Sequence, residues 1–258
     1  MIANYHTHTK RCGHAFVDER EVVESAVKQG WKVIGFSEHV PFIAPSGRQF
    51  EGAHMPVETL DDYFQTLTAL QKEYQGKIEI PIGFECEYYP DIHEETLKRF
   101  EGYPLDYLIL GQHTLDSEYQ HSCFEASDDL GRFKEYASLL TEGMRTGRYS
   151  YVAHPDVYQF TGSDADFERV MGDICELAAE INLPLEYNLL GKNGNRHYPS
   201  DRMARLATEC GASLILGADI HYDWQMQDQT EMIAESTRHL VEDLGATLVD
   251  TVTLKKPI

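Results

Sequence analysis

Histidine, glutamate and aspartate residues recur in short groups along this 258-residue chain, at spacings that suit metal binding. The first group is His6-Thr7-His8, which closes a short apolar run. Residues two apart on an extended segment point to the same side, so both imidazoles can bind one ion. An H-x-H pattern alone is weak evidence, because it is common by chance. Its weight comes from the groups that follow it in the chain.

The other groups stand where predicted strands end. Apolar patterning predicts β-strands at residues 1–5, 31–37, 78–84, 105–110, 149–153, 185–188 and 213–218. Six of these seven end in metal-type residues: His6 and His8, Glu38 and His39, Glu85, His113, His154, and Asp219 with His221. The carboxyl ends of the strands of a βα barrel meet on one face, where catalytic groups gather. We therefore expect one metal site on that face.

Helical patterns separate the predicted strands. Asp18 and Glu21 form a capping-box-like start for a helix whose apolar stripe stops at Gly30. Further helices are predicted over about 60–74, 92–100, 129–146, 166–181, 201–210 and 231–244. His93, in the second of these, is expected to face solvent. The alternation indicates an α/β fold with a parallel sheet, either closed as a barrel or doubly wound.

Composition bounds the class of protein. The chain has 22 Lys+Arg against 43 Asp+Glu, a formal net charge of −21, which disfavours nucleic acid and anionic membranes as partners. Its five cysteines are scattered and odd in number, as in a reduced cytoplasmic protein. The start lacks an apolar leader, and no apolar run approaches the length of a membrane span. We expect a cytoplasmic protein with a small-molecule substrate, whose oligomeric state the sequence leaves open.

No linker-like composition divides the chain, so a single domain over residues 1–258 is the simplest interpretation. Residues 41–59 form its one large loop, for which a lid or substrate wall and a plain surface excursion are both open. His14, in the first loop, could bind metal or be an exposed loop residue. Glu38 is expected to orient His39 rather than to bind metal itself. His113 and His154 could bind metal, or they could be core histidines that hydrogen-bond to backbone carbonyls.

The order of these motifs resembles the polymerase-and-histidinol-phosphatase (PHP) superfamily. The motifs are H-x-H, E-H, G-x-E, G-x-H, H-P-D and D-x-H, and together they span nearly the whole chain. The opening H-T-H-T…C-G-H-A, the long loop after Glu38-His39-Val40-Pro41-Phe42, and the stretch Asn188…Arg196…Tyr198-Pro199 look like the histidinol-phosphate phosphatase branch. The resemblance implies a distorted barrel of seven strands with a trinuclear metal centre.

Carried onto this sequence residue by residue, the resemblance implies three metal positions. The first is held by His6, His8, Glu85 and Asp219. Glu85 bridges to the second, which is held also by His113 and His154. The third is held by His14, His39 and His221. The family often has aspartate where this chain has Asn4, and the lost charge would slightly weaken the orientation or basicity of His6.

Imidazoles with two carboxylates suit Zn, Fe or Mn better than Mg or Ca. Three divalent ions bring about +6 against about −2 from Glu85 and Asp219, so an acidic protein can still contain a cationic pocket for phosphate. A bridging water, its pKa lowered from about 15.7 toward about 7, would attack phosphorus as a metal-bound hydroxide. Glu85, Asp219 and His221 are the expected catalytic residues, with no residue assigned as general acid. Arg196, in a Gly-containing cationic loop, is the candidate for binding phosphate oxygens, and a solvated surface arginine is the alternative.

The function that these features favour is hydrolysis of L-histidinol phosphate to L-histidinol and phosphate, a reaction of histidine biosynthesis. This small substrate is cationic at its non-phosphate end, which would suit acidic walls around the site. One alternative is a PHP phosphoesterase for another small phosphate or a nucleotide. Another is a catalytically silent metal-binding regulatory domain, although the complete ligand set argues against silence.

Overall fold

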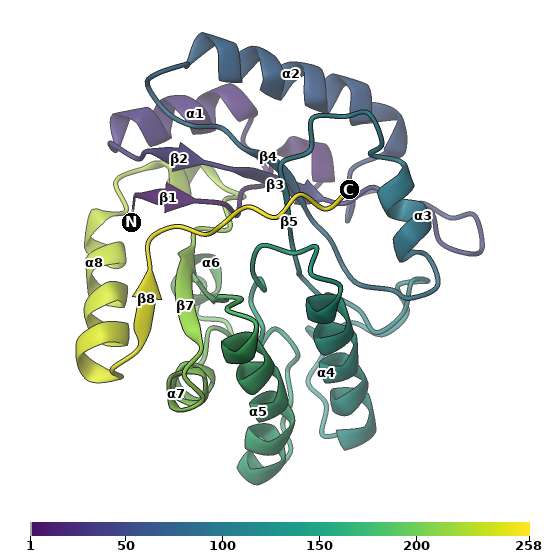
Figure 1. Ribbon diagram of the computed structural model, residues 1–258, viewed down its shortest axis with the longest axis vertical. Helices are drawn as coiled ribbons and strands as arrows, with labels where there is room; N and C mark the ends of the chain where they lie inside the picture. Colours follow the sequence, from purple (N-terminus) through teal and green to yellow (C-terminus); the bar gives the residue numbers. More distant parts are fainter. Residues whose placement is uncertain (1) are drawn as a thin grey trace.

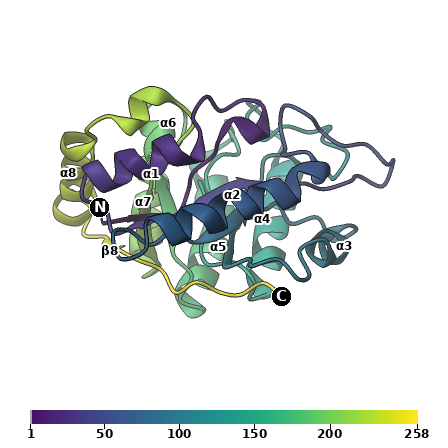
Figure 2. The same cartoon turned by 90° about the horizontal axis from the view of Figure 1, so that it is seen from above.

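The computed structural model describes residues 2–258 and places helices on the outside of a group of short strands (Figure 1). The strands are β1 (Ala3–Asn4), β2 (Val33–Ile34), β3 (Phe36–His39), β4 (Ile82–Glu85), β5 (Tyr107–Ile109), β6 (Leu185–Asn188), β7 (Ser213–Gly217) and β8 (Thr247–Val249). The α-helices are α1 (Glu19–Lys28), α2 (Leu60–Glu73), α3 (His93–Lys98), α4 (Leu130–Arg145), α5 (Asp164–Glu180), α6 (Leu189–Asn193), α7 (Asp201–Glu209) and α8 (Thr230–Arg238). Short 3₁₀ turns cover Lys10–Cys12, Val57–Thr59 and Asp223–Met226, and a π turn over His239–Asp243 extends α8. Turned by 90°, the molecule shows α1 and α2 lying side by side along one flank (Figure 2).

The first helix forms for the reasons that its sequence suggests. The Asp18 side chain accepts a hydrogen bond from the Glu21 amide, and the Glu21 side chain accepts one from the Asp18 amide, so the predicted capping box is present. Val22, Val23 and Ala26 are buried along one face of α1. Gly30 follows the helix with φ of 78°, a left-handed conformation that favours glycine.

The strands pair in three small sheets, β1–β2, β3–β4–β5 and β6–β7–β8, and every pair is parallel. The register aligns the carboxyl ends of β3 and β4, because His39 lies opposite Glu85. Between β6 and β7, Asn188 lies opposite Gly217. Side chains that close one strand are thus brought beside those that close the next, as expected of parallel strands.

Isolated parallel bridges connect the sheets. Val152 bridges both Leu110, after β5, and Leu185 of β6, and backbone hydrogen bonds of residues 150–153 join the same segments, so the predicted strand at 149–153 lies between β5 and β6. Thr7 bridges Ile220, which joins the end of the β1 segment to the end of the β7 segment. The α/β class with parallel strands is confirmed, and over residues 2–258 the named strands pair in three small sheets. Residue 1, part of the predicted first strand, lies outside the described residues.

A small apolar core lies among the strands, separate from the larger core beneath the helices. Its buried members are Ala3, Tyr5, Val33, Tyr107, Ile109, Tyr151, Ala153 and Ile215. The Tyr107 hydroxyl donates to the carbonyls of Tyr5 (2.8 Å) and Phe36 (3.0 Å), which ties β5 to the segments around β1 and β3. The tail after β8, yellow in Figure 1, crosses the strands, and its Val252 and Leu254 pack against this core.

One expectation about burial is wrong. His93 is 4% exposed and packs between the rings of Tyr88 (centroids 4.9 Å apart) and Tyr149 (6.0 Å), because α3 presents it to the core rather than to solvent. The five cysteines are free thiols. Within residues 2–258, no helix combines the length and the apolar character needed to cross a bilayer.

Candidate metal centre and active site

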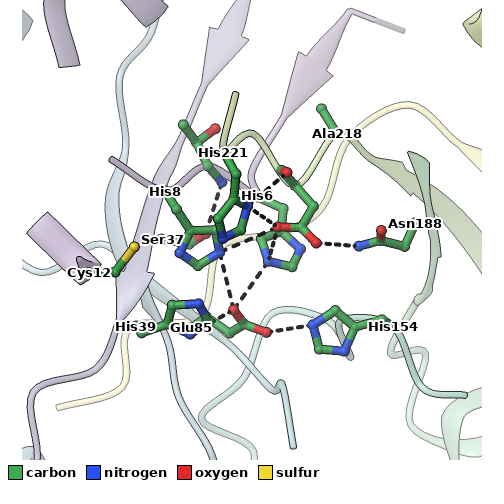
Figure 3. A network of polar contacts seen from close by, with 12 residues as sticks. His6, His8, Cys12, Ser37, His39, Glu85, His154, Asn188, Ala218 and His221 are labelled. Atoms are coloured by element: carbon green, nitrogen blue, oxygen red, sulfur yellow. Dashed lines mark hydrogen bonds and ion pairs between the residues drawn. The ribbon is translucent and has the colours of Figure 1, made fainter. Parts of the chain in front are cut away.

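The predicted strand-end residues converge on one site (Figure 3). Those that meet there are His6, His8, His39, Glu85, His113, His154, Asp219 and His221. All eight side chains are buried. Polar groups are seldom collected in a protein interior unless they have partners, so this concentration is a functional feature and not a consequence of packing.

Glu85 lies at the centre of the group. Three imidazole nitrogens face its Oε2, those of His6 (3.3 Å), His8 (3.2 Å) and His39 (3.3 Å). Two more face its Oε1, those of His113 (3.3 Å) and His154 (2.7 Å). Gly111 makes room for this carboxylate, because a Cβ there would lie 1.9 Å from Oε1. A carboxylate with imidazoles on both oxygens has the arrangement needed to bridge two cations.

Asp219 forms a second acidic point beside Glu85. Its Oδ1 lies 3.5 Å from His6 Nε2, 3.6 Å from His8 Nε2 and 3.1 Å from His221 Nδ1. The backbone is left-handed at Asp219 (φ 48°) and at His154 (φ 27°). Such conformations in residues other than glycine cost on the order of 1–3 kcal/mol and cluster at functional sites. Both therefore hold their side chains in directions that an ordinary strand end would not give.

The crowding of charges shifts the pKa values of these groups in opposite directions. Although burial opposes it, the surrounding histidines hold the pKa values of Glu85 and Asp219 well below their ordinary range. Burial and the neighbouring His221 lower the pKa of His8 to about 3. His113 is also buried, yet the carboxylates of Glu85 and Glu87 raise its pKa to about 10. The site thus mixes ionised carboxylates with at least one imidazole that stays neutral, which is the form that binds a metal.

Several buried polar atoms of the site have no hydrogen-bond partner among the described residues. They include both ring nitrogens of His8 and one oxygen each of Glu85 and Asp219, which face other imidazoles and carboxylates of the site except for His8 Nδ1. A buried polar atom without a hydrogen bond costs roughly 1–3 kcal/mol, and a bound cation would offset that cost. Several groups bring their ligand atoms within 4.8 Å of one another, among them His6 with His8 and Glu85, His6 with His154 and Asp219, and His8 with His39 and His221. The donor set of imidazoles and carboxylates fits transition-metal ions such as Zn²⁺.

His14 lies at the edge of the group rather than inside it. Its ring stacks on His221 with centroids 5.1 Å apart and lies 5.0 Å from the ring of His39. Its Nδ1 is 3.1 Å from the Gly52 carbonyl oxygen. The ligand atoms that gather with His14 are those of Cys12 and His221, whereas His39 groups with His8 and His221. His14 is half-buried and lies beside His39 and His221, the two partners that the resemblance implies for it.

A cavity of about 300 Å³ opens above these residues. Glu85 and Asp219 are the carboxylates that line it, and Arg196 lies in its wall. Arg196 is an exposed residue in the cavity wall, and its Nη1 donates to the Tyr198 hydroxyl at 2.6 Å. The other wall residues are largely aromatic: Tyr119, Phe124, Tyr198 and Tyr222. The net charge suggested acidic walls, but the walls are largely aromatic. The loop at 41–59 contributes Gly52 and Ala53 to them.

Two further carboxylates support the site from behind, and neither was identified from the sequence. Glu87 Oε1 lies 2.9 Å from His113 Nδ1, and Glu186 Oε1 lies 2.7 Å from His6 Nδ1. The spacing Glu85-Cys86-Glu87 turns both glutamates to the same side of the chain and could have indicated the first. The strand at 185–188 has no histidine, so nothing in its sequence indicated the second.

Glu38 and Asn4 have roles other than those expected. Glu38 Oε1 accepts hydrogen bonds from the backbone amide and the hydroxyl (2.6 Å) of Thr9, and no hydrogen bond joins it to His39 in the described chain. Asn4 Nδ2 donates to the His6 carbonyl at 3.0 Å, and its Oδ1 accepts from the Ala218 amide at 2.9 Å. Asn4 thus fixes the backbone that carries His6. Although burial opposes it, the carboxylates of Glu186, Asp219 and Glu85 raise the pKa of His6.

Comparisons with known proteins agree with this geometry. A family model described as the PHP domain matches residues 4–189. The chain is 27% identical over 229 residues to a Deinococcus radiodurans protein named "Probable histidinol-phosphatase", with 85% of this chain and 86% of that protein covered. It is also 27% identical to the histidinol-phosphatase of Bacillus subtilis, with 84% and 92% covered. Among solved structures, histidinol phosphate phosphatase of Lactococcus lactis in complex with zinc, L-histidinol and phosphate matches with a TM-score of 0.70 at 21% identity, with 97% of this chain and 96% of that one covered. That likeness extends the shared fold over nearly the whole chain.

Proposed function

This chain belongs to the PHP domain family, and we propose that it is a metal-dependent phosphatase that converts L-histidinol phosphate into L-histidinol and phosphate. The observation that carries the proposal is the pair of carboxylates, Glu85 and Asp219, set among imidazoles on the floor of a cavity whose wall holds Arg196. The names of the relatives support the substrate, because the two similar proteins described above are both called histidinol-phosphatases. The reaction places the protein in histidine biosynthesis, and thus in the cytoplasm.

The proposal includes three transition-metal ions (Zn, Fe or Mn). Their ligands would be His6, His8, His14, His39, Glu85, His113, His154, Asp219 and His221. The buried nitrogens of His8 and the buried oxygens of Glu85 and Asp219 support this assignment, because in the described structure they make no hydrogen bond and face only other ligand-type groups or none. Bound at these positions, the ions would supply Lewis acidity for the phosphoryl oxygens and a water of lowered pKa as nucleophile.

The chain's own residues orient the substrate. Arg196 would bind phosphate oxygens with the guanidinium nitrogens that Tyr198 leaves free, and a planar guanidinium suits such bidentate contacts. Asp219 and His221 line the same cavity and would lie beside the reacting phosphate. The aromatic wall of Tyr119, Phe124 and Tyr222 is suited to an imidazole or ammonium group, through stacking or cation–π contacts.

The cavity size supports a small substrate over a polymer. About 300 Å³ holds a phosphorylated amino alcohol but no strand of nucleic acid, and the net charge of −21 disfavours a polyanion. We also propose that residues 1–258 form one domain and that the bridges of Thr7 to Ile220, Leu110 to Val152 and Val152 to Leu185 close the three sheets into a distorted seven-stranded barrel. The small core among the strands supports this, because it has the position of a barrel interior.

The test is phosphate release from histidinol phosphate, p-nitrophenyl phosphate and a nucleoside monophosphate, with metal content measured on the same samples. We expect kcat/KM for histidinol phosphate to exceed that for p-nitrophenyl phosphate at least about 100-fold, or about 2.7 kcal/mol of differential transition-state binding. Activity should disappear with a strong chelator and return with Zn²⁺ or Mn²⁺. Equal rates on the two substrates, or a preference for the nucleotide, would contradict the substrate assignment. Full activity in metal-free protein would contradict the mechanism.

A further inference from the structure

Glu186, on β6, connects several parts of the candidate metal centre without lining its cavity. The residue is 3% exposed. Its Oε1 lies 2.7 Å from His6 Nδ1, and its Oε2 accepts hydrogen bonds from the His154 backbone amide (2.9 Å) and from Asn188 Nδ2 (2.9 Å). The same Asn188 Nδ2 lies 3.0 Å from Asp219 Oδ2. One carboxylate thus contacts two segments that carry candidate ligands and, through Asn188, is linked to a third.

The surroundings of Glu186 are built for an ionised carboxylate. The His154 amide and the Asn188 Nδ2 group can only donate, so Oε2 must accept from both. His6 then donates from Nδ1 to Oε1. Gly217, opposite on β7, leaves the space that the carboxylate occupies, because a Cβ at this position would lie 1.7 Å from Glu186 Oε1. The sixth strand, which carries no histidine at its end, therefore supplies an acceptor for donors on its neighbours.

The contact with His6 determines which ring nitrogen is available to a metal ion. When Nδ1 carries the proton shared with Glu186, Nε2 keeps its lone pair. That nitrogen faces Glu85 Oε2 at 3.3 Å and Asp219 Oδ1 at 3.5 Å. Carboxylates in this position behind a metal-bound histidine fix its orientation and raise its basicity, and removing one typically costs 10–100-fold in metal affinity.

We propose that Glu186 is a positioning residue of the metal centre, which holds the His6 ring in its metal-binding orientation and fixes the His154 backbone and, through Asn188, the Asp219 carboxylate. The inference rests on the proposed function, because it requires that His6, His154 and Asp219 bind metal. It adds a residue outside the nine proposed ligands. It also gives β6 a role in the site, since the other strand segments around it already contribute ligands.

The test compares the wild type with Glu186→Gln, which has nearly the same shape. A glutamine side chain has one oxygen that accepts and one NH₂ group that only donates. Its NH₂ group would therefore face another donor, either His6 or the pair formed by His154 and Asn188. Tyr187→Phe is the matched control, because Tyr187 is the next residue on the same strand, is also buried, and contacts none of these ligands. Glu186→Asp is a second variant that keeps the charge but withdraws the carboxylate from His6.

Zinc affinity would be measured by chelator competition on each folded protein, together with the visible spectrum of the Co²⁺-loaded form and the melting temperature of the metal-free form. We expect about 10–100-fold weaker zinc binding and an altered Co²⁺ spectrum in Glu186→Gln, with Tyr187→Phe like the wild type. If Glu186→Gln does not fold, the same loss is expected in Glu186→Asp. A residue that only supported the fold would lower the melting temperature and leave affinity and spectrum unchanged.

Wild-type affinity and spectrum in a folded Glu186 variant would overturn the inference. The wild type separates this outcome from a failure of the proposed function. If it binds metal and hydrolyses histidinol phosphate while a Glu186 variant binds zinc equally well, only the role of Glu186 is refuted. If the wild type binds no transition metal, both proposals are refuted.

Discussion

Replacing Gly111 by alanine should displace Glu85 without changing any polar group. Gly111 has an ordinary backbone conformation, so alanine introduces no backbone strain there. Its Cβ, however, would lie 1.9 Å from Glu85 Oε1, 2.6 Å from Cδ and 2.7 Å from Cγ. Non-bonded heavy atoms do not approach this closely, so either the Glu85 side chain or the backbone at residue 111 has to move.

The size of the displacement follows from these distances. To reach an ordinary contact of about 3.4 Å, Oε1 must retreat by roughly 1.5 Å from its starting distance of 1.9 Å. Glu85 has imidazoles on both of its oxygens, so a shift in any direction disturbs at least one of the contacts to His113 and His154 or to His6, His8 and His39. Misplacing a catalytic group by about 1 Å can cost on the order of 100-fold in rate, or about 2.7 kcal/mol.

We expect Gly111→Ala to lower kcat/KM for histidinol phosphate about 100-fold or more and to reduce the bound metal. The matched control is Gly172→Ala in α5, where a Cβ meets nothing within 4 Å. That variant should keep full activity and gain about 0.5–1 kcal/mol in stability, because alanine is favoured over glycine in a helix. Both variants would be assayed by phosphate release, metal analysis and thermal unfolding. Gly111→Ala with wild-type activity and metal content would refute the argument that Gly111 makes room for the Glu85 carboxylate.

Two more predictions concern residues on the cavity wall and in the core. Arg196→Met should lower kcat/KM roughly tenfold to over 100-fold, since a charge-assisted hydrogen bond contributes about 1.5–3 kcal/mol, while metal content stays unchanged; an unaltered kcat/KM would make Arg196 a simple wall residue. Burial, with the nearby positive charge of Arg148, lowers the pKa of His93 from its ordinary 6.5 to about 4, so folding favours the neutral ring. The stability that the neutral ring contributes is complete above pH 6.5 and is lost as the pH falls toward 4. As the pH falls from 7 to 4, the free energy of unfolding of His93→Phe should therefore rise by about 2–3 kcal/mol relative to that of the wild type. Denaturant unfolding of both metal-free proteins measures this difference, and parallel stability curves would contradict the prediction.

The parts of the site that the sequence predicts are those that geometry forces together. His39 and Glu85 end adjacent parallel strands, and their register alone places them opposite each other. The apolar run at 149–153 also predicts its place correctly, because residues 150–153 make backbone hydrogen bonds to the segments of β5 and β6, although only Val152 forms bridges there.

The supporting carboxylates could not be predicted for a different reason. A buried glutamate such as Glu186 looks like any other glutamate in a sequence, and its role depends on partners 180 residues away, such as His6. Glu38 shows the same difficulty, because adjacency to His39 suggested a contact that the structure replaces with one to Thr9. His93 was misassigned because a short helix gives too few turns to tell its buried face from its exposed one.

The bridge between Thr7 and Ile220 has a consequence for how the protein matures in the cell. His6 and His8 are synthesised before their partners Asp219 and His221, which follow more than 210 residues later. At synthesis rates of about 5–20 residues per second, the amino-terminal histidines wait roughly 10 to 40 s for the rest of their site. During that interval the segment that pairs with Thr7, and the ligands Asp219 and His221 beside it, have not yet been synthesised. We therefore expect the proposed metal centre to form only after His221 has been synthesised, so that its ions bind the assembled site rather than the H-x-H segment alone.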